Sequence, residues 1–402
     1  MWGPQDRSGL QPVPGGATAA DGFRAAGVVS GVKPSGNPDL ALLVADEVAG
    51  AAAVTTTNLV KAPACRLTEA HVADGKARAV VINAGNANVC TPDGDAHAAR
   101  LAAVTAGHLG VAADEVLVMS TGVIGVPLPI ERIEAALPAA VDALSPDGGD
   151  AAAQAMLTTD THGKQVAFRV TDEQGSCVVG GMAKGVGMIE PAMATLLVAI
   201  TTDAPLGGPI ARKVLRSAVA TTFNRISVDG DGSTSDTVAL LAGGSASHPP
   251  RLDTLARAVH AVCADLARQV VADGEGATRV AAVTVRQAAT EADAERLARA
   301  VATSLLVRAA IHGADPNWGR ILMAMGNAQV DFDPRRVGIR CAGVTVCRFG
   351  VAASFDRNQA TIAMSKPEIE IEIDLGSGDA AATVLTCDLT PEYVRFNAEY
   401  TT

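Results

Sequence analysis

The amino-acid sequence predicts an α+β layered fold. Two observations favour this class over a doubly wound parallel sheet. Segments with helical and with strand periodicity follow one another without a regular strand–helix–strand order, and the segment IEIEIDL (369–375) alternates apolar and acidic residues, as a half-exposed antiparallel strand does. Hydrophobic residues make up 48% of the chain and aromatic residues only 3%, so Ala, Val and Leu must fill a large core.

Helical spacing is clearest in residues 251–273, where apolar residues recur every third or fourth position, and Gly274 then provides a stop. Thr290 and Asp293 resemble a capping box that opens a second helix running toward Ile311. The other predicted helices are 129–144 and 208–222, and the predicted strands are VAFRV (centred on 167–170), SCVVG (176–180), VAAVTVR (280–286), VGIRCAG (337–343) and IEIEIDL (369–375). A shift in composition near 275–290 predicts a larger region, 1–280, and a smaller α/β region, 281–402.

Composition and charge exclude several classes of protein. The chain carries 32 Lys and Arg against 43 Asp and Glu, a net charge of −11, which argues against a protein that coats nucleic acid. The apolar runs are too short for a membrane-spanning helix, and MWGPQDRSGL at the N-terminus has no apolar secretory segment. Seven scattered Cys without a CxxC motif indicate reduced thiols. We therefore expect a cytoplasmic protein.

The common metal and phosphate motifs are absent from the sequence. The seven His form neither H-E-x-x-H nor a Cys/His cluster, and we expect no metal. The segment DGDGSTSD (229–236) begins like a calcium loop, but Thr234 stands where that loop needs Gly and Leu240 where it needs Glu. Lys184-Gly185-Val186-Gly187 is rich in glycine but matches no nucleotide-binding motif, and indicates a close backbone approach or a positive φ.

The segment KGVGMIEPAMATLLVAI (184–200) carries two interpretations of Thr195. The local pattern alone is typical of a β-branched residue at the start of a buried strand. The other interpretation is a nucleophile. If the peptide bond after Ala194 is cut, the freed α-amine of Thr195 can act as a general base for its own hydroxyl.

Acyl transfer at Thr195 also needs donors for an oxyanion. Ser120-Thr121-Gly122 follows the apolar run 116–119, and a strand that ends in Thr-Gly can offer a hydroxyl and a backbone N–H to one oxygen. The more common explanation of Thr-Gly after a strand is a simple turn.

Taken together, the motifs resemble the ornithine acetyltransferase family, whose members are also called bifunctional glutamate N-acetyltransferase/amino-acid acetyltransferases. The matching segments run nearly end to end and comprise GFRAAGVVSGVK (22–33), TTTNLVKAPA (55–64), NAGNANVC (83–90), STGVIG (120–125), TTDT (158–161), KGVGMIEPAMAT (184–195), FNRISVDGDGSTSDT (223–237), DGEGAT (273–278), GADPNWGRI (313–321) and YVRFNAEYTT (393–402).

This resemblance implies cleavage between Ala194 and Thr195, and ping-pong transfer of acetyl from N2-acetylornithine to glutamate through an acyl-enzyme on Thr195. It implies an oxyanion hole made by Thr121 and Gly122. The substrate-binding positions that it implies are Thr161, Lys184, Thr195, Glu275, Asn397 and Thr402. Asp229, Asp231, Asp236, Asp315, Asn317 and Arg320 match family segments too, and we interpret them as structural or supporting residues.

The resemblance further implies an α/β/β/α sandwich around the nucleophile, with the end of the smaller region returning to the active site. It implies small-molecule substrates (N-acetylornithine, ornithine and glutamate), no bound cofactor, and acetyl-CoA as a second acetyl donor in bifunctional members. The two cleaved chains are expected to associate as a heterotetramer of two α and two β chains. Neither nucleic acid nor membrane is expected as a partner.

Three alternatives stay open at this point. One is an amidase or aminopeptidase-like hydrolase of the same fold, although the related aminopeptidases use Ser at the cleavage point. Another is a paralogue that serves a secondary-metabolite pathway, because Glu190 and the surrounding KGVGM-EP segment resemble clavam-pathway paralogues. The third is a non-enzymatic binding protein, which would require loss of residues that this chain retains.

Overall fold

The computed structural model describes residues 9–190 and 196–399, and its strands form two separate sheets in two compact units. The larger unit holds the described residues up to Asn224 and Asp231–Val270. The smaller unit holds Arg225–Gly230 and the described residues from Val271 onward. The sequence predicts the regions 1–280 and 281–402. It does not predict that Arg225–Gly230 belongs to the smaller unit.

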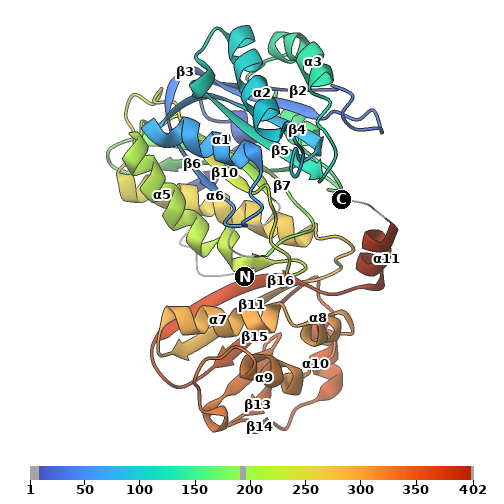
Figure 1. The fold of residues 1–402 in the computed structure, drawn as a ribbon. Helices are drawn as coiled ribbons and strands as arrows, with labels where there is room; N and C mark the ends of the chain where they lie inside the picture. Colours follow the sequence, from blue (N-terminus) through green and yellow to red (C-terminus); the bar gives the residue numbers. More distant parts are fainter. Residues whose placement is uncertain (1–8, 191–195, 400–402) are drawn as a thin grey trace. The chain divides into compact units, whose positions relative to one another are not determined.

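The larger unit carries most of the described strands, the helices α1 to α5 and nearly all of α6 (Figure 1). Its strands are β1 (Leu10–Pro12), β2 (Phe23–Val28), β3 (Leu40–Thr55), β4 (Lys76–Asn86), β5 (Val116–Val123), β6 (Lys164–Thr171), β7 (Ser176–Lys184), β8 (Leu197–Thr202) and β10 (Thr237–Ala242). Its helices are α1 (Pro63–His71), α2 (Gly94–Leu109), α3 (Ile130–Asp142), α4 (Gly149–Ala155) and α5 (Gly208–Thr221), and α6 (Leu252–Ala272) ends at the boundary.

One long strand, β3, connects two layers of sheet in the larger unit. Its first half pairs with β2 and β4, and its second half pairs with β10, which continues into β8, β7, β6 and β1. Side chains alternate along β3, so Leu43 faces a core shared with β8 and β10, while Leu42 faces a core shared with α2 and α3. The two layers thus pack face to face and helices cover the outside.

Helix α6 covers the outer face of the second layer, because Val262 and Leu266 lie against Gly181 of β7. A Cβ at Gly181 would approach these side chains to 3.1 Å, so a glycine there permits close packing. The larger unit is therefore the α/β/β/α sandwich that the resemblance implied.

The smaller unit packs helices on a mixed seven-stranded sheet of the described residues. Its strands are β9 (Ile226–Ser227), β11 (Val280–Ala288), β12 (Gly338–Cys341), β13 (Val344–Arg348), β14 (Val351–Ala352), β15 (Glu368–Asp374) and β16 (Ala380–Cys387). Its helices are α7 (Glu291–Ala302), α8 (Leu305–His312), α9 (Trp318–Gly326), α10 (Arg357–Met364) and α11 (Pro391–Glu399). Helix α7 buries Ala294, Leu297 and Val301 against this sheet, at the spacing of one helical face.

The predicted helices and strands are confirmed with two corrections. The predicted helix from Thr290 to Ile311 is two helices, because Ser304 caps a new one by accepting the Val307 N–H at 3.4 Å. The strand predicted at 369–375 alternates as expected, with Ile371 buried and Glu372 paired to Arg286 and Arg340. It is antiparallel only to β12 and runs parallel to β11, a pairing that its alternation does not encode.

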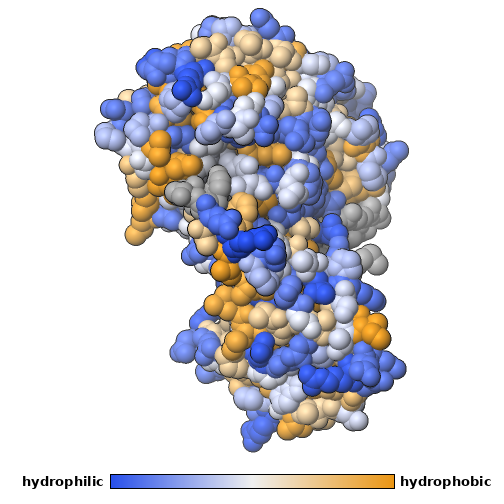
Figure 2. Space-filling view, turned by 90° about the vertical axis from the view of Figure 1, so that its right-hand side faces the viewer, coloured by the Kyte–Doolittle hydropathy of each residue, from blue (hydrophilic) through white to orange (hydrophobic). Residues whose placement is uncertain are grey.

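Polar and apolar side chains are mixed over the surface. The space-filling view shows hydrophilic residues over much of the visible face, with hydrophobic residues in smaller groups among them (Figure 2). No helix in the described ranges is long and apolar enough to cross a membrane. All seven cysteines are free thiols, and Cys90 alone among them is exposed.

Candidate active site

The Thr121-Gly122 step lies inside strand β5, paired with the end of β4. Gly122 has a φ of 129° and stands opposite Gly85, whose φ is 102°. A Cβ at Gly122 would lie 2.3 Å from the carbonyl carbon of Gly85, which no real side chain can do. The close approach of two strands at this point therefore requires glycine, and the simple-turn interpretation is wrong because both residues belong to the strand.

Buried amides hold the ends of β4 and β5 in place. Asn83 accepts a hydrogen bond from the Ser120 hydroxyl at 2.6 Å and donates to the Asn86 carbonyl at 2.8 Å. Asn86 in turn accepts the N–H of Asn88 at 2.8 Å. Because buried amides are costly unless paired, this network fixes the backbone beside Thr121. The asparagines of the NAGNAN segment thus have a structural role.

Lys184, at the end of β7, reaches Thr121. Its ammonium donates to Thr121 Oγ1 at 3.4 Å, and both side chains are almost fully buried. The two residues lie 63 positions apart in the sequence. Thr121 therefore presents a hydroxyl that already accepts a bond from a cation, so its own hydrogen can be donated onward. The structure brings these two predicted site residues together.

Asp160 is the electrostatic partner that the sequence analysis missed. Its carboxylate accepts hydrogen bonds from Lys164 Nζ at 2.7 Å and from the Gly185 N–H at 2.6 Å, and Lys184 Nζ lies 3.9 Å away. Burial alone would raise the pKa of Asp160, but the charges of Lys184 and Lys164 outweigh it and lower the pKa. Asp160 is therefore a charged carboxylate in a buried position.

Lys33 is a further cation near this cluster. Its ammonium donates to the Pro38 carbonyl at 2.6 Å, and its Cγ lies 3.0 Å from where a Cβ of Gly85 would stand. Burial lowers the pKa of Lys33 and the charge of Lys184 lowers it further, against the opposing charges of Asp39 and Asp160. The stem of Lys33 thus lies beside the glycine that faces Gly122.

Thr161 directly follows Asp160 in the sequence, but its side chain is exposed whereas those of Asp160, Lys164 and Lys184 are buried. Its Oγ1 forms a hydrogen bond of 2.9 Å with Nδ1 of His162. Asp160, directly before it, points its carboxylate inward to the two lysines. The segment TTDT therefore contributes a buried anion as well as the predicted exposed hydroxyl.

Glu275 and Asn397 form a second pair, within the smaller unit. The Asn397 amide donates to Glu275 Oε2 at 2.9 Å and to the Tyr393 carbonyl at 3.1 Å. Thr390 anchors the same helix, α11, by donating to the Gly276 carbonyl at 2.8 Å. The structure thus brings together these two predicted residues, which lie 122 positions apart.

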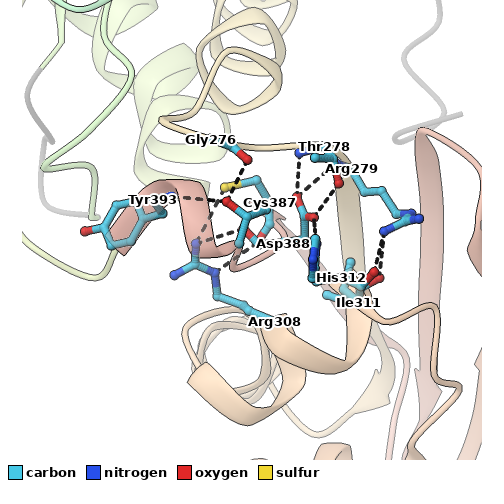
Figure 3. A network of polar contacts seen from close by, with 10 residues as sticks. Gly276, Thr278, Arg279, Arg308, Ile311, His312, Cys387, Asp388 and Tyr393 are labelled. Carbon is cyan, nitrogen blue, oxygen red and sulfur yellow. Dashed lines mark hydrogen bonds and ion pairs between the residues drawn. The ribbon is translucent and has the colours of Figure 1, made fainter. Parts of the chain in front are cut away.

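Asp388, shortly before α11, binds the segment that follows Glu275 (Figure 3). Its carboxylate accepts from the backbone and hydroxyl of Thr278, from the Arg279 N–H, and from His312 at 2.9 Å. Burial opposes ionisation, yet these hydrogen bonds lower the pKa of Asp388. Buried Arg308 then binds the Cys387 carbonyl at 2.9 Å, so one polar network joins the segment after Glu275 to the segment before α11.

The remaining predicted positions, Ala194, Thr195 and Thr402, lie outside the described residues. Asp315, Asn317 and Arg320 have structural contacts: Asn317 caps α9 by accepting the Arg320 N–H at 3.1 Å and donates to Asp315 at 2.9 Å. Within residues 9–190 and 196–399, no group of three or more His, Cys, Asp or Glu could hold a metal ion.

The larger unit offers a chemically coherent site. A hydroxyl and a backbone N–H at a glycine-only position suit a developing oxyanion, and a buried ammonium beside them suits a substrate carboxylate. A substrate that has both an ester or amide carbonyl and a free carboxylate could bind the oxyanion donors with the carbonyl oxygen and the ammonium with the carboxylate.

Comparisons with known proteins identify the family of this chain. The model of the ArgJ family matches residues 24–402. The chain is 46% identical to "Arginine biosynthesis bifunctional protein ArgJ" of Gloeobacter violaceus, over 97% of this chain and 98% of that one, and 46% identical to the protein of the same name from Thermus thermophilus, over 95% and 98%. A crystal structure of the Bacillus halodurans protein of that name is 34% identical, covers 51% of this chain and 98% of that chain, and has a TM-score of 0.49. The match over nearly the whole chain leads to one conclusion: this protein belongs to the ArgJ family.

Proposed function

We infer that this chain is an acetyltransferase of arginine biosynthesis, which moves acetyl from N2-acetylornithine to glutamate. The observation that carries this inference is the end-to-end match to relatives named as arginine biosynthesis bifunctional proteins. The contact between Lys184 and Thr121 supports it, because an ammonium that can bind a carboxylate lies next to a hydroxyl that can stabilise an oxyanion.

We propose the following course for the reaction. Cleavage after Ala194 frees the α-amine of Thr195, which takes the proton of the Thr195 hydroxyl as Oγ attacks the acetyl carbonyl carbon. The C–N bond of N2-acetylornithine breaks, and ornithine leaves with that proton on its nitrogen. The amine of glutamate then attacks the acetyl ester, and Thr195 Oγ regains a proton.

Thr121 and Gly122 stabilise the oxyanion in both halves of this cycle. One positioned donor contributes roughly 10²–10³-fold to the rate. Lys184 binds a substrate carboxylate, and Asp160 keeps that ammonium oriented. Glu275, Asn397, Thr161 and Thr402 bind the remaining polar groups of the substrates.

We propose acetyl-CoA as a second acetyl donor, and the word "bifunctional" in the names of the relatives supports this. We also propose that no resident cofactor is needed, that the cleaved chains assemble two and two, and that the enzyme works in the cytoplasm.

A transfer assay separates this function from hydrolysis. Purified protein is incubated with N2-acetylornithine, with and without glutamate, and ornithine, N-acetylglutamate and acetate are measured. We expect ornithine and N-acetylglutamate to form in equal amounts, and Thr195→Ala to form neither. Release of acetate at the same rate without glutamate would instead establish a hydrolase. Transfer retained by Thr195→Ala would rule out the nucleophile.

A further inference from the structure

The buried carboxyl of Asp236 lies beside Leu196, the residue that follows Thr195 at the predicted cleavage site. Strands β8 and β10 are parallel, with Thr237 beside Leu197, so Asp236 stands beside Leu196. Asp236 Oδ1 accepts the Leu196 N–H at 3.1 Å, and the Leu196 carbonyl accepts the Thr237 N–H at 3.1 Å. Leu196 is bonded to Thr195. Asp236, directly before β10, and Thr237, the first residue of β10, therefore bind both backbone groups of the residue after the predicted nucleophile.

Asp236 is itself firmly anchored. Its side chain is 0% exposed, and its own carbonyl accepts the Thr56 N–H at 3.0 Å and the Cys65 thiol at 3.5 Å. If Asp236 served only to accept the Leu196 N–H, an amide or a hydroxyl side chain could replace its carboxyl. A carboxyl in a fully buried position costs more free energy than either if it is charged. The residue type therefore needs a further explanation.

The surroundings of Asp236 favour its protonated form. Burial raises the pKa well above the usual range for a carboxyl, and hydrogen bonds from Leu196, Ser233 and Thr56, together with the more distant charge of Lys184, offset this only in part. In the protonated form, which burial favours, the carboxyl accepts the Leu196 N–H with one oxygen and carries an exchangeable proton on the other.

We propose that Asp236 is the proton-transfer residue of self-cleavage between Ala194 and Thr195. In that step Thr195 Oγ bonds to the Ala194 carbonyl carbon and loses its proton, the C–N bond breaks, and the Thr195 nitrogen gains a proton. Asp236 gives its proton to this nitrogen and receives the proton of the hydroxyl, so the acid is restored and an ester remains. Water then hydrolyses the ester. The inference rests on the proposed cleavage site.

The test uses the full-length chain in a cell-free translation time course, with the fraction cleaved measured by intact mass. Asp236→Asn keeps the volume and the oxygen that accepts the Leu196 N–H, but it has no acid proton. We expect its cleavage to be roughly 10²–10⁴-fold slower, the usual contribution of general acid–base catalysis. Cleavage of Asp236→Asn at the wild-type rate would overturn the proposal.

Asp203 provides a matched control at the other end of β8. It too is a buried carboxyl whose pKa is raised by burial, and it accepts the Val178 N–H at 2.8 Å. We expect Asp203→Asn to cleave at the wild-type rate. If Asp203→Asn slows cleavage as much as Asp236→Asn does, the loss of any buried carboxyl beside β8 is enough to slow cleavage. That result would overturn the proposal.

Hydroxylamine identifies the step that is lost. It attacks esters and leaves peptide bonds intact, so it releases residues 1–194 as a hydroxamate wherever the ester has formed. We expect it to leave Asp236→Asn uncleaved, because without the proton to nitrogen no ester forms. Release of the hydroxamate from Asp236→Asn would show that the ester forms without Asp236 and would overturn the proposal. A wild-type chain cut elsewhere or not at all would reject the proposed function itself.

Discussion

Asp160 and Asp236 are two buried aspartates of the same unit, in regions with opposite electrostatics. Asp160, beside the end of β7, has one lysine ammonium at 2.7 Å and another at 3.9 Å, and its pKa is lowered. Asp236, before β10, accepts a neutral N–H, and its pKa is raised. The difference teaches that nearby cations, more than burial itself, decide whether a buried carboxyl serves as a fixed charge or as an acid.

Neutralising each aspartate gives the largest contrast. In a Thr195→Ala background, where the proposed cleavage cannot occur, Asp160→Asn leaves two buried ammonium groups without their carboxylate. We expect the free energy of unfolding to fall by about 3–5 kcal/mol. Asp236→Asn replaces a carboxyl whose neutral form is favoured by burial, with an amide of the same shape, and should cost about 1 kcal/mol or less. Urea unfolding of the two double variants measures both, and equal losses would contradict the assignment of charge.

Removing the Thr121 hydroxyl tests the charged region without changing its charge. Thr121→Val keeps the shape but removes the group that accepts from Lys184, and we expect kcat for acetyl transfer to fall roughly 10²–10³-fold. The control is Thr105→Val, because Thr105 Oγ1 is buried and has no hydrogen-bond partner within the described ranges. A Thr121→Val enzyme with the activity of the control would exclude Thr121 from the oxyanion hole.

The pH dependence of stability should have opposite signs in the two regions. The lowered pKa of Asp160 gives stability that is present above the unfolded value of about 3.9 and is lost as the pH falls toward the folded value. The raised pKa of Asp236 means that the folded chain holds a proton which the unfolded chain releases, so stability declines as the pH rises above about 3.9 toward the folded value.

Unfolding of the same double variants from about pH 2 to about pH 7 measures this difference. Relative to the Thr195→Ala parent, Asp236→Asn should gain stability as the pH rises above about 4. The stability deficit of Asp160→Asn should instead shrink as the pH falls below about 4. Parallel curves for the two variants would show that the aspartates titrate alike.

Asn397 extends the comparison to an exposed site and gives the smallest effect. Its hydrogen bond to Glu275 joins a neutral amide to a carboxyl group and is accessible to water. We expect Asn397→Ala to change the free energy of unfolding by less than about 0.5 kcal/mol. KM for the acetyl donor should rise roughly 2–10-fold, because the proposed hydrogen bond between Asn397 and the substrate is lost. Steady-state kinetics and thermal unfolding check both, and an unchanged KM would remove Asn397 from the binding site.

The sequence predicts the secondary structure and the chemistry better than the geometry. Periodicity identifies α6 and β15 because each has one buried face. Asp160 could have been found: the predicted strands centred on 167–170 and at 176–180 form a hairpin, and its register pairs Lys164 with Ala183, which brings the residues before Lys164 near Lys184. The contact of Asp236 with Leu196 could not, because parallel pairing of β8 with β10 spans 40 residues and leaves no local pattern.

The most direct test of the whole account is the intact mass of purified wild-type protein under denaturing conditions, with N-terminal sequencing of each chain. The account predicts two chains, residues 1–194 and 195–402, the second beginning with Thr195. That result gives Thr195 the free α-amine that the transfer reaction requires and that the cleavage step proposed for Asp236 produces. A single chain of 402 residues, or a cut at another bond, would contradict it.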